Sequence, residues 1–309
     1  MKTQPLKGMR DLLPREQALR DYIQGQILDT YRAAGFQRIS TPILEDMENL
    51  DKSDGGDNLN LIFKVLKRGE KLAAALRSGD EKQLSDMGLR YDLTLPLSRY
   101  YAANRNELPN PFKVIQTDRV YRAERPQKGR LREFVQCDID ILGDSSPNAE
   151  VELIDVTTRA LLRIGFKDFT VNINDRRILR AMLEKMGFAA DQLDSVCISF
   201  DKLDKIGPEK VKTILVEDFA VSEADADEIL KFIAIKGSNE EVLTALEGYT
   251  GRNGMFDQGL SELNTVVKYL ADFGVPAENF AVDLTIARGL DYYTGTVYET
   301  TLLDHPEIG

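Results

Sequence analysis

The stretch VIQTDRVYRAERPQKGRLREFVQCDIDILG, residues 114–143, decides the fold that this sequence predicts. Its first arm, 114–122, and its return arm, 134–142, alternate bulky apolar residues with polar ones, as half-buried strands do. The segment between them contains Pro126 and Gly129, which disfavour a regular element, and it gathers basic residues. We therefore expect a two-stranded hairpin whose loop binds an anion.

One face of this hairpin is expected to carry charges of both signs. Side chains two residues apart on a strand share a face, which would place Gln136, Asp138 and Asp140 together. Arg122 stands at the end of the outgoing arm. A cation beside acids suits a zwitterionic ligand next to a phosphate. Periodicity alone favours the alternative of an exposed hairpin with a solvated basic turn.

The amino-acid sequence of the loop resembles that of an enzyme family. Residues 120–130, VYRAERPQKGR, followed by Arg132-Glu133-Phe134, resemble motif 2 of class II aminoacyl-tRNA synthetases. Within it, ERPQKGR is similar to the histidyl-tRNA synthetases in particular. The resemblance implies an α+β fold: an antiparallel class II sheet flanked by helices, with a mostly helical insertion domain.

The resemblance also implies roles for the residues that match motif 2. Arg122 would bind the α-phosphate of ATP as a catalytic residue, and Arg130 would reach the β- or γ-phosphate. Phe134 would stack on adenine, with Glu124 near the amino edge of the base. Guanidinium groups suit phosphates because they stay charged and grip oxygens bidentately.

The N-terminal region resembles the same family. Its opening, GMRDLLP at residues 8–14, is similar to the start of histidyl-tRNA synthetases. A helix is predicted from Pro14 to Gly35, with one apolar stripe formed by Leu19, Tyr22, Ile23, Ile27 and Tyr31. The helix and a following strand to Pro42 resemble class II motif 1, which implies a homodimer.

A second polar pair follows at residues 89–97. Alternation predicts Asp92 and Thr94 on one strand face, with Pro96 ending the strand and a helix beginning near Ser98. A carboxylate beside a hydroxyl can accept hydrogen bonds from an ammonium group. The family uses an Arg-x-Asp/Glu-x-Thr segment here, so the resemblance implies that Asp92, Thr94 and Gln136 bind the α-amino group of histidine.

Residues 288–295, RGLDYYTG, resemble the histidine-specific segment of the family. Paired tyrosines are more often core residues than ligands. The resemblance nevertheless implies that Arg288 is catalytic and lies between the α-phosphate and the histidine carboxylate, opposite the motif 2 arginine. It also implies that Tyr292 and Tyr293 bind histidine, with Asp140 and Tyr293 pairing the two ring nitrogens. Such a pocket rejects isosteres.

Three segments are expected along the chain. Residues 1–187 would form the class II catalytic core with motifs 1 and 2, and residues 274–309 would return to it. Residues 188–273 are rich in Asp, Glu and Lys with helical periodicity, which predicts a helical insertion domain. The resemblance implies that this insertion contacts the tRNA acceptor arm, and the alternative is a surface subdomain without a partner.

Composition limits the partners and the cellular compartments that we expect for this protein. A net charge of −11 argues against a generally basic nucleic-acid coat, so any RNA contact would be local. Cys137 and Cys197 have no CxxC partner and fit a reducing compartment. We expect neither a signal peptide nor a membrane span, and hence a cytoplasmic protein.

No metal site of the protein's own is predicted. Asp51, Asp54 and Asp57 are spaced by three residues rather than two, and no Glu occupies the twelfth position that a calcium loop requires. His305, the lone histidine, is expected to be a solvated loop residue.

The resemblance implies one reaction in which these residues act together. The histidine carboxylate would attack the α-phosphorus of ATP, with Mg²⁺ on the phosphates, to give histidyl adenylate, and histidine would then pass to tRNA(His). The partners would be L-histidine, ATP and tRNA(His). The sequence stops at Gly309, before the family's motif 3 and anticodon-binding domain. We therefore expect a catalytic fragment that activates histidine poorly or not at all.

Two other functions remain open on the sequence alone. The regulatory subunit of ATP phosphoribosyltransferase keeps the same fold and binds histidine as a signal without catalysis. Retention of Arg122, Arg130 and Arg288 favours the synthetase, because a sensor needs no triphosphate clamp. A plain RNA-binding module using the basic hairpin agrees less well with the acidic total charge.

Overall fold

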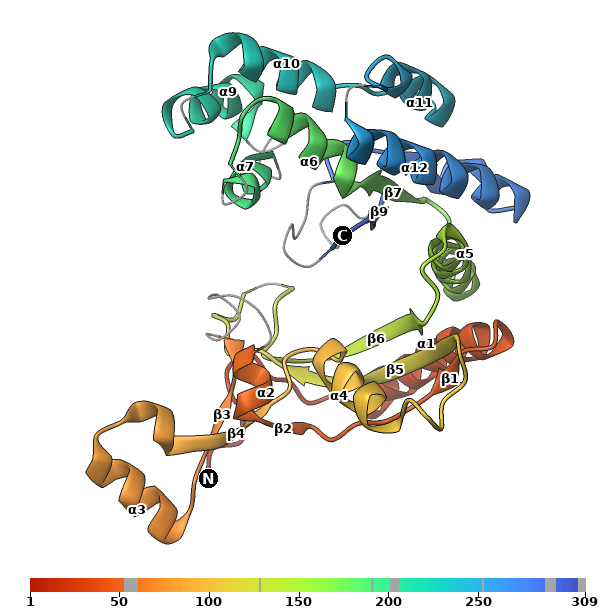
Figure 1. Cartoon of the computed structure of the whole chain (residues 1–309). Coiled ribbons are helices and arrows are strands. Elements are labelled where there is room, and N and C mark those ends of the chain that lie inside the picture. Colours follow the sequence, from red (N-terminus) through yellow and green to blue (C-terminus); the bar gives the residue numbers. More distant parts are fainter. Residues whose placement is uncertain are drawn as a thin grey trace. The chain divides into compact units, whose positions relative to one another are not determined.

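The computed structural model describes residues 1–52, 61–127, 129–189, 192–200, 206–219, 221–251, 253–286 and 293–304, with only the backbone of residues 194 and 197–199. The chain divides into two compact units, Met1–Asp144 and Ser145–Gly309. The described strands form two sheets in the first unit and one in the second (Figure 1). Each unit has its own hydrophobic core. The described helices and strands confirm the predicted α+β class.

The predicted hairpin forms the centre of the first unit. Strands β5 (Phe112–Tyr121) and β6 (Glu133–Leu142) are antiparallel and paired along their whole length. The short β1 (Gln37–Arg38) adds to the other edge of β5 in parallel, so this sheet is mixed and not purely antiparallel. The outgoing arm buries four successive residues, 114–117, and also Val120, so the predicted alternation of a half-buried strand is wrong for its first half, where both faces of β5 are covered.

The predicted N-terminal helix is confirmed as α1 (Pro14–Ala33). Pro14 occupies the first helical position, where its missing N–H has no helical acceptor. Gly35 follows with a φ of +88°, a left-handed conformation that glycine adopts at little cost. Of the predicted apolar stripe, Tyr31 is buried whereas Leu19 and Tyr22 are 60% and 62% exposed. The first half of the helix thus presents apolar side chains to solvent.

A second sheet in the first unit has the order β2-β4-β3, with all pairs antiparallel. Its elements are β2 (Leu44–Asp46), α2 (Met47–Lys52), β3 (Lys64–Leu66), α3 (Gly69–Ser78), the 3-10 helix η2 (Glu81–Leu84) and β4 (Ser85–Leu89). Figure 1 shows α3 at the far end of the arm that β3 and β4 form. Among the residues of α3 only Ala75 is buried. Helix α4 (Thr94–Asn104) leads from this sheet to β5.

The second unit is built on β7 (Phe169–Asp175), which pairs in parallel with β8 (Phe280–Val282) and antiparallel with β9 (Thr296–Leu302). Helices α6 (Arg176–Lys185) and α12 (Gly254–Asp272) pack on β7, and α5 (Pro147–Ile164) packs on α12. The remaining elements are α7 (Leu193–Phe200), α9 (Pro208–Glu217), α10 (Glu223–Ile233), α11 (Asn239–Glu247) and the 3-10 helix η3 (Ala277–Asn279).

The predicted helical character of residues 188–273 agrees with the structure. The described part of that range contains five helices from α7 to α12 and no strand. Their buried residues join those of α5, α6 and β7 in one hydrophobic cluster that runs from Val151 to Leu302. The boundaries predicted for an insertion domain remain a prediction.

Gly88 offers a test of the packing in the β2-β4-β3 sheet. It lies on the central strand, and a Cβ there would stand 2.8 Å from Ile62 Cγ2 and from Leu50 Cδ1. Since both neighbours are buried core residues, we expect Gly88→Ala to destabilise the fold by about 1–3 kcal/mol. Urea unfolding followed by circular dichroism measures this loss.

Gly25→Ala is the matched control. Gly25 lies inside α1, and no atom comes within 4 Å of its added Cβ. Alanine also favours the helix, so this variant is expected to match or exceed the wild-type stability. Equal stability of both variants would show that Gly88 is not packed as described.

Candidate active site

The register of β5 and β6 gathers the predicted polar side chains on one face. Asp140 lies opposite Val114, Asp138 opposite Gln116 and Gln136 opposite Asp118. Because every second residue shares a face, this face of β6 carries Phe134, Gln136, Asp138 and Asp140 in a row. The grouping predicted from alternation is therefore present.

Arg122, at the end of β5, leans over the same face. Its guanidinium carbon lies 5.1 Å from the centroid of the Phe134 ring, within the range of a cation–π contact. Its Nε donates a hydrogen bond to the Tyr91 carbonyl at 3.0 Å. The two contacts fix the plane of the guanidinium, which leaves its outer nitrogens as the groups available for a ligand.

Three carboxyl groups interact with one another in this site, and two of them, Asp92 and Asp138, also interact with Arg122. Burial raises the pKa of Asp138 to about 7, with Asp140 and Asp92 raising it further and Arg122 opposing them. Burial, together with the charge of Asp92, raises the pKa of Asp140 to about 6. The pKa of Asp92 is also raised by burial, against the Leu95 N–H and the charge of Arg122. The cluster holds more negative charge than its single arginine balances, so a cationic group is the ligand it favours.

Gln136 adds an acceptor to this cluster. Its Oε1 is buried and has no hydrogen-bond partner in the described part of the chain. An unsatisfied buried acceptor costs free energy unless a ligand or water supplies a donor. Gln136 therefore suits a ligand N–H, as expected for an ammonium group.

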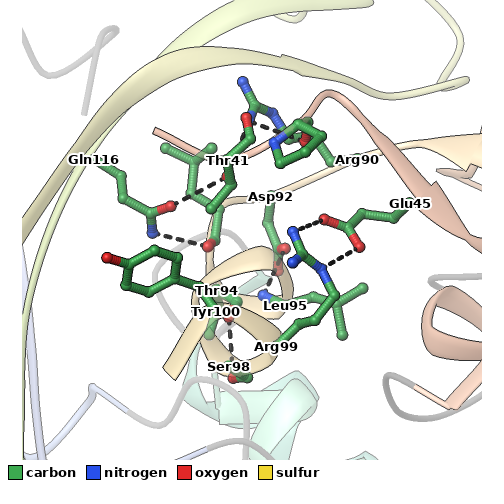
Figure 2. A network of polar contacts seen from close by, with 12 residues as sticks. Thr41, Glu45, Arg90, Asp92, Thr94, Leu95, Ser98, Arg99, Tyr100 and Gln116 are labelled. Carbon is green, nitrogen blue, oxygen red and sulfur yellow. Dashed lines mark hydrogen bonds and ion pairs between the residues drawn. The ribbon is translucent and has the colours of Figure 1, made fainter. Parts of the chain in front are cut away.

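The structure corrects the predicted setting of Asp92 and Thr94. They do not lie on a strand, because β4 ends at Leu89 and α4 begins at Thr94 rather than near Ser98. Asp92 Oδ1 accepts from the Leu95 N–H at 3.3 Å, so the carboxylate caps the first turn of α4 (Figure 2). Pro96 is tolerated in this first turn, where its missing N–H would have no helical acceptor.

Arg90 holds the turn that carries Asp92, a role that the sequence pattern did not indicate. This side chain is 1% exposed. Its Nε donates to the Arg119 carbonyl at 2.9 Å, one terminal nitrogen donates to the Thr41 carbonyl at 2.8 Å, and the other lies 2.9 Å from Asp118. A buried guanidinium with this many partners joins β5, the chain before β2 and the turn after β4.

Gln116 and Arg99 complete the support (Figure 2). The side-chain amide of Gln116, on β5, donates to the Leu93 carbonyl at 2.9 Å. Arg99, on α4, donates to both carboxylate oxygens of buried Glu45 at 2.7 and 2.8 Å. The start of α4, and with it Asp92 and Thr94, is thereby fixed to both sheets of the first unit.

The loop between β5 and β6 folds against the N-terminal segment. The Arg132 N–H donates to the Gly8 carbonyl at 2.7 Å, and Arg132 Nε donates to the Glu124 carbonyl at 3.0 Å. A Cβ on Gly8 would lie 2.7 Å from Pro126 Cγ, and the φ of Gly8 is +88°. Arg130 lies 3.7 Å from the carboxylate of Glu124. The opening GMRDLLP and the basic loop thus form one structural element.

The predicted residues of the second unit are described in part. Tyr293 is 46% exposed, and its carbonyl accepts a hydrogen bond from Arg176. Arg288 and Tyr292 lie outside the described residues, as do Asp54, Asp57, His305 and residues 201–205.

The described residues contain neither a metal cage nor a membrane helix. No group of three or more His, Cys, Asp or Glu side chains there could hold a metal ion. None of the helices in that part of the chain is both long enough and apolar enough to cross a membrane.

The raised pKa values predict a pH-dependent stability. Carboxyls whose folded pKa exceeds the ordinary value of 3.8 stabilise the fold fully below about pH 4, and this contribution is lost as the pH rises through 6 and 7. Asp138→Asn removes one such group. We expect the Tm of this variant, measured against wild type, to increase between about pH 4 and pH 7 and to level off above about pH 7.

Glu107→Gln, which alters an exposed carboxylate, is the control and should show no such trend. A pH-independent difference for Asp138→Asn would contradict the burial of its carboxyl.

Comparisons with known proteins find relatives over almost the whole chain. The family model described as histidyl-tRNA synthetase matches residues 8–305. The chain is 42% identical to the histidine--tRNA ligase of Leifsonia xyli subsp. xyli over 99% of its length, and 38% identical to that of Clostridium tetani over 98%. It spans 71% and 66% of these two relatives.

Solved structures show the same fold. The crystal structure of histidyl-tRNA synthetase from Nostoc sp. PCC 7120 superposes with a TM-score of 0.88 at 33% identity, covering 100% of this chain and 67% of that one. The structure of an ATP phosphoribosyltransferase regulatory subunit/histidyl-tRNA synthetase from Bacillus halodurans C superposes with a TM-score of 0.81, covering 98% of this chain and 73% of that one. At 23% identity, this second likeness concerns the fold alone.

Proposed function

This chain belongs to the histidyl-tRNA synthetase family, and we propose that it binds L-histidine and ATP and forms histidyl adenylate for transfer to tRNA(His). One observation carries the proposal beyond family membership. Asp138 and Asp140 share one face of β6, Asp92 acts on both of them, and Arg122 acts on Asp138 and Asp92. Such a cluster suits a ligand with a positive end beside a negative one, as an amino acid has.

The carboxylates and amide would hold histidine. Asp92, Thr94 and the buried Oε1 of Gln136 would accept hydrogen bonds from the α-ammonium group. Asp140 would accept an imidazole N–H, and Tyr293 and Tyr292 would contact the ring. Asp138 lies between Gln136 and Asp140 on β6, and we add it to the predicted set as a second carboxylate for the ammonium.

The arginines would hold ATP. Attack of the histidine carboxylate on the α-phosphorus forms a C–O–P bond and releases pyrophosphate, and negative charge builds on the α-phosphate oxygens. Arg122 and Arg288 would stabilise that charge, while Arg130 would bind the outer phosphates. Phe134 would stack on adenine, with Glu124 near its amino group. The contact between Arg122 and the Phe134 ring supports this assignment, because one ligand could touch both.

Mg²⁺ would accompany ATP and neutralise its phosphate oxygens. No group of three or more His, Cys, Asp or Glu side chains in the described residues has the geometry to hold the ion. We therefore propose that the phosphates themselves are its main ligands, and no step of the proposed reaction depends on a metal–protein bond.

Three further assignments belong to the proposal. Exposed Leu19 and Tyr22 on α1 support a homodimer through this helix. The segment 188–273 is proposed as an insertion domain within a core formed by residues 1–187 and 274–309, with the tRNA acceptor arm as its partner. A cytoplasmic location follows from a tRNA substrate.

A histidine sensor is the alternative. The regulatory role named for the Bacillus halodurans protein makes this alternative specific. A sensor needs histidine but no nucleotide, whereas Arg122 and Arg130 supply two phosphate-binding groups. Binding of ATP and histidine-dependent pyrophosphate exchange separate the two functions.

Asp140 tests the proposed histidine site. We expect Asp140→Ala to abolish histidine-dependent ATP–pyrophosphate exchange and to weaken L-histidine binding by at least about tenfold, because an imidazole N–H loses its buried acceptor. ATP binding should stay close to wild type. Isothermal titration calorimetry with each ligand and an exchange assay give the three values.

Glu107→Gln is again the control, since it removes a carboxylate on the exposed surface. Unchanged L-histidine affinity in Asp140→Ala would refute the assignment of this residue. Histidine binding without any ATP binding in the wild-type chain would favour the sensor.

A further inference from the structure

The junction between β7 and α6 is a buried polar element in the second unit. Asn174, Asp175 and Arg176 are 1%, 0% and 5% exposed. Polar side chains are buried this deeply only with partners, because each unpaired group costs free energy. The side chains of Asn174 and Arg176 bind the two described arms that flank residues 287–292 in the sequence.

Asn174 binds the arm that precedes those residues. Its side-chain amide donates to the Leu284 carbonyl at 3.3 Å and to the Ile286 carbonyl at 3.0 Å. Its Oδ1 accepts from the Asp175 N–H at 2.8 Å, which fixes the rotamer of the side chain. One amide group thus holds two carbonyls of a single turn.

The same arm is closed by Asp283. Its carboxylate accepts from the N–H of Thr285 at 2.9 Å and from the hydroxyl at 2.7 Å. Its own N–H donates to the Ile173 carbonyl on β7 at 2.9 Å. The chain after β8 is therefore tied to β7 at consecutive positions.

Arg176 binds the arm that follows. Its guanidinium donates to the Tyr293 carbonyl, and its backbone N–H donates to the Gly295 carbonyl at 3.0 Å. Two residues of this arm are thus held by one arginine, next to the pair that Asp175 forms with Thr296 of β9.

The neighbouring Arg177 has different partners from Arg176. It pairs with Asp175 and with Glu262 of α12, which fastens α6 to another helix. Arg176 instead directs a buried guanidinium to a backbone carbonyl of an irregular segment. Burying a cation for that purpose is costly, so a chain retains it where the position of the segment matters.

We propose that Arg176 is a positioning residue that fixes Tyr293 for contact with L-histidine, and that Asn174 does the same for the arm at Leu284–Ile286. This inference rests on the proposed function, which assigns Tyr293 to the histidine ring. Neither residue is expected to touch the substrate. Both act through the backbone that they hold.

The test uses Arg176→Gln and Arg176→Lys in the 309-residue chain, with Arg180→Gln as the matched control. Arg180 lies on the same helix, with its guanidinium 2.8 Å from Glu184. Amide hydrogen exchange by mass spectrometry reports on peptides that cover residues 293–296. Calorimetry measures the affinity for L-histidine and, separately, for ATP.

Arg176→Gln is expected to speed exchange at residues 293–296 and to weaken histidine binding about tenfold, with ATP affinity unchanged. Arg176→Lys, which keeps one charged donor, should recover part of both effects even if the glutamine variant folds poorly. Arg180→Gln should behave as wild type.

Faster amide hydrogen exchange in Arg176→Gln with unaltered histidine affinity would overturn the proposal, because Arg176 would then have a structural role only. Unaltered exchange would overturn it too. A wild-type chain that binds no histidine would instead refute the proposed function, and exchange would still decide whether Arg176 holds Tyr293.

Discussion

The candidate site of the first unit depends on one constraint: the partly buried carboxyls of Asp138 and Asp140 lie side by side on one face of β6, with the Arg122 guanidinium acting on Asp138. Burial raises the pKa of Asp138 and of Asp140, and the arginine opposes this for Asp138. One cation cannot balance several carboxylates that are poorly solvated. The folded protein therefore has uncompensated negative charge at this site. A bound ammonium group would relieve it, which gives the proposed site its preference for an amino acid.

The surrounding residues keep this arrangement in place. Arg90 ties the turn before Asp92 to β5, and Gln116 holds the start of α4 through the Leu93 carbonyl. Both are buried, and each contacts backbone carbonyls rather than a ligand site. The second unit repeats the strategy, because Asn174 and Arg176 hold backbone carbonyls on either side of the proposed histidine segment. Buried polar side chains thus position the irregular segments in both units.

The hairpin was predictable because apolar residues recur through both arms on either side of a loop with Pro126 and Gly129, and the face shared by Gln136 and Asp140 follows from the period of two in a strand. The position of Asp92 before a helix was not predictable from alternation. It depends on a hydrogen bond from the Leu95 N–H to the Asp92 carboxylate, which the alternation of residues does not indicate. Arg90 was missed as a support for the same reason: its partners Thr41, Asp118 and Arg119 are distant in sequence. Arg288 and Tyr292 remain assignments from family resemblance.

Proton release on histidine binding tests the central claim most directly. An ammonium group placed beside Asp138 would favour its ionised form and lower its pKa, so protons should leave the protein when L-histidine binds near pH 7. Calorimetric titrations in buffers of different ionisation enthalpy measure this quantity. The account predicts an apparent binding enthalpy that varies with the buffer and a proton release that Asp138→Asn reduces. Binding with no buffer dependence, and no change in the variant, would contradict it.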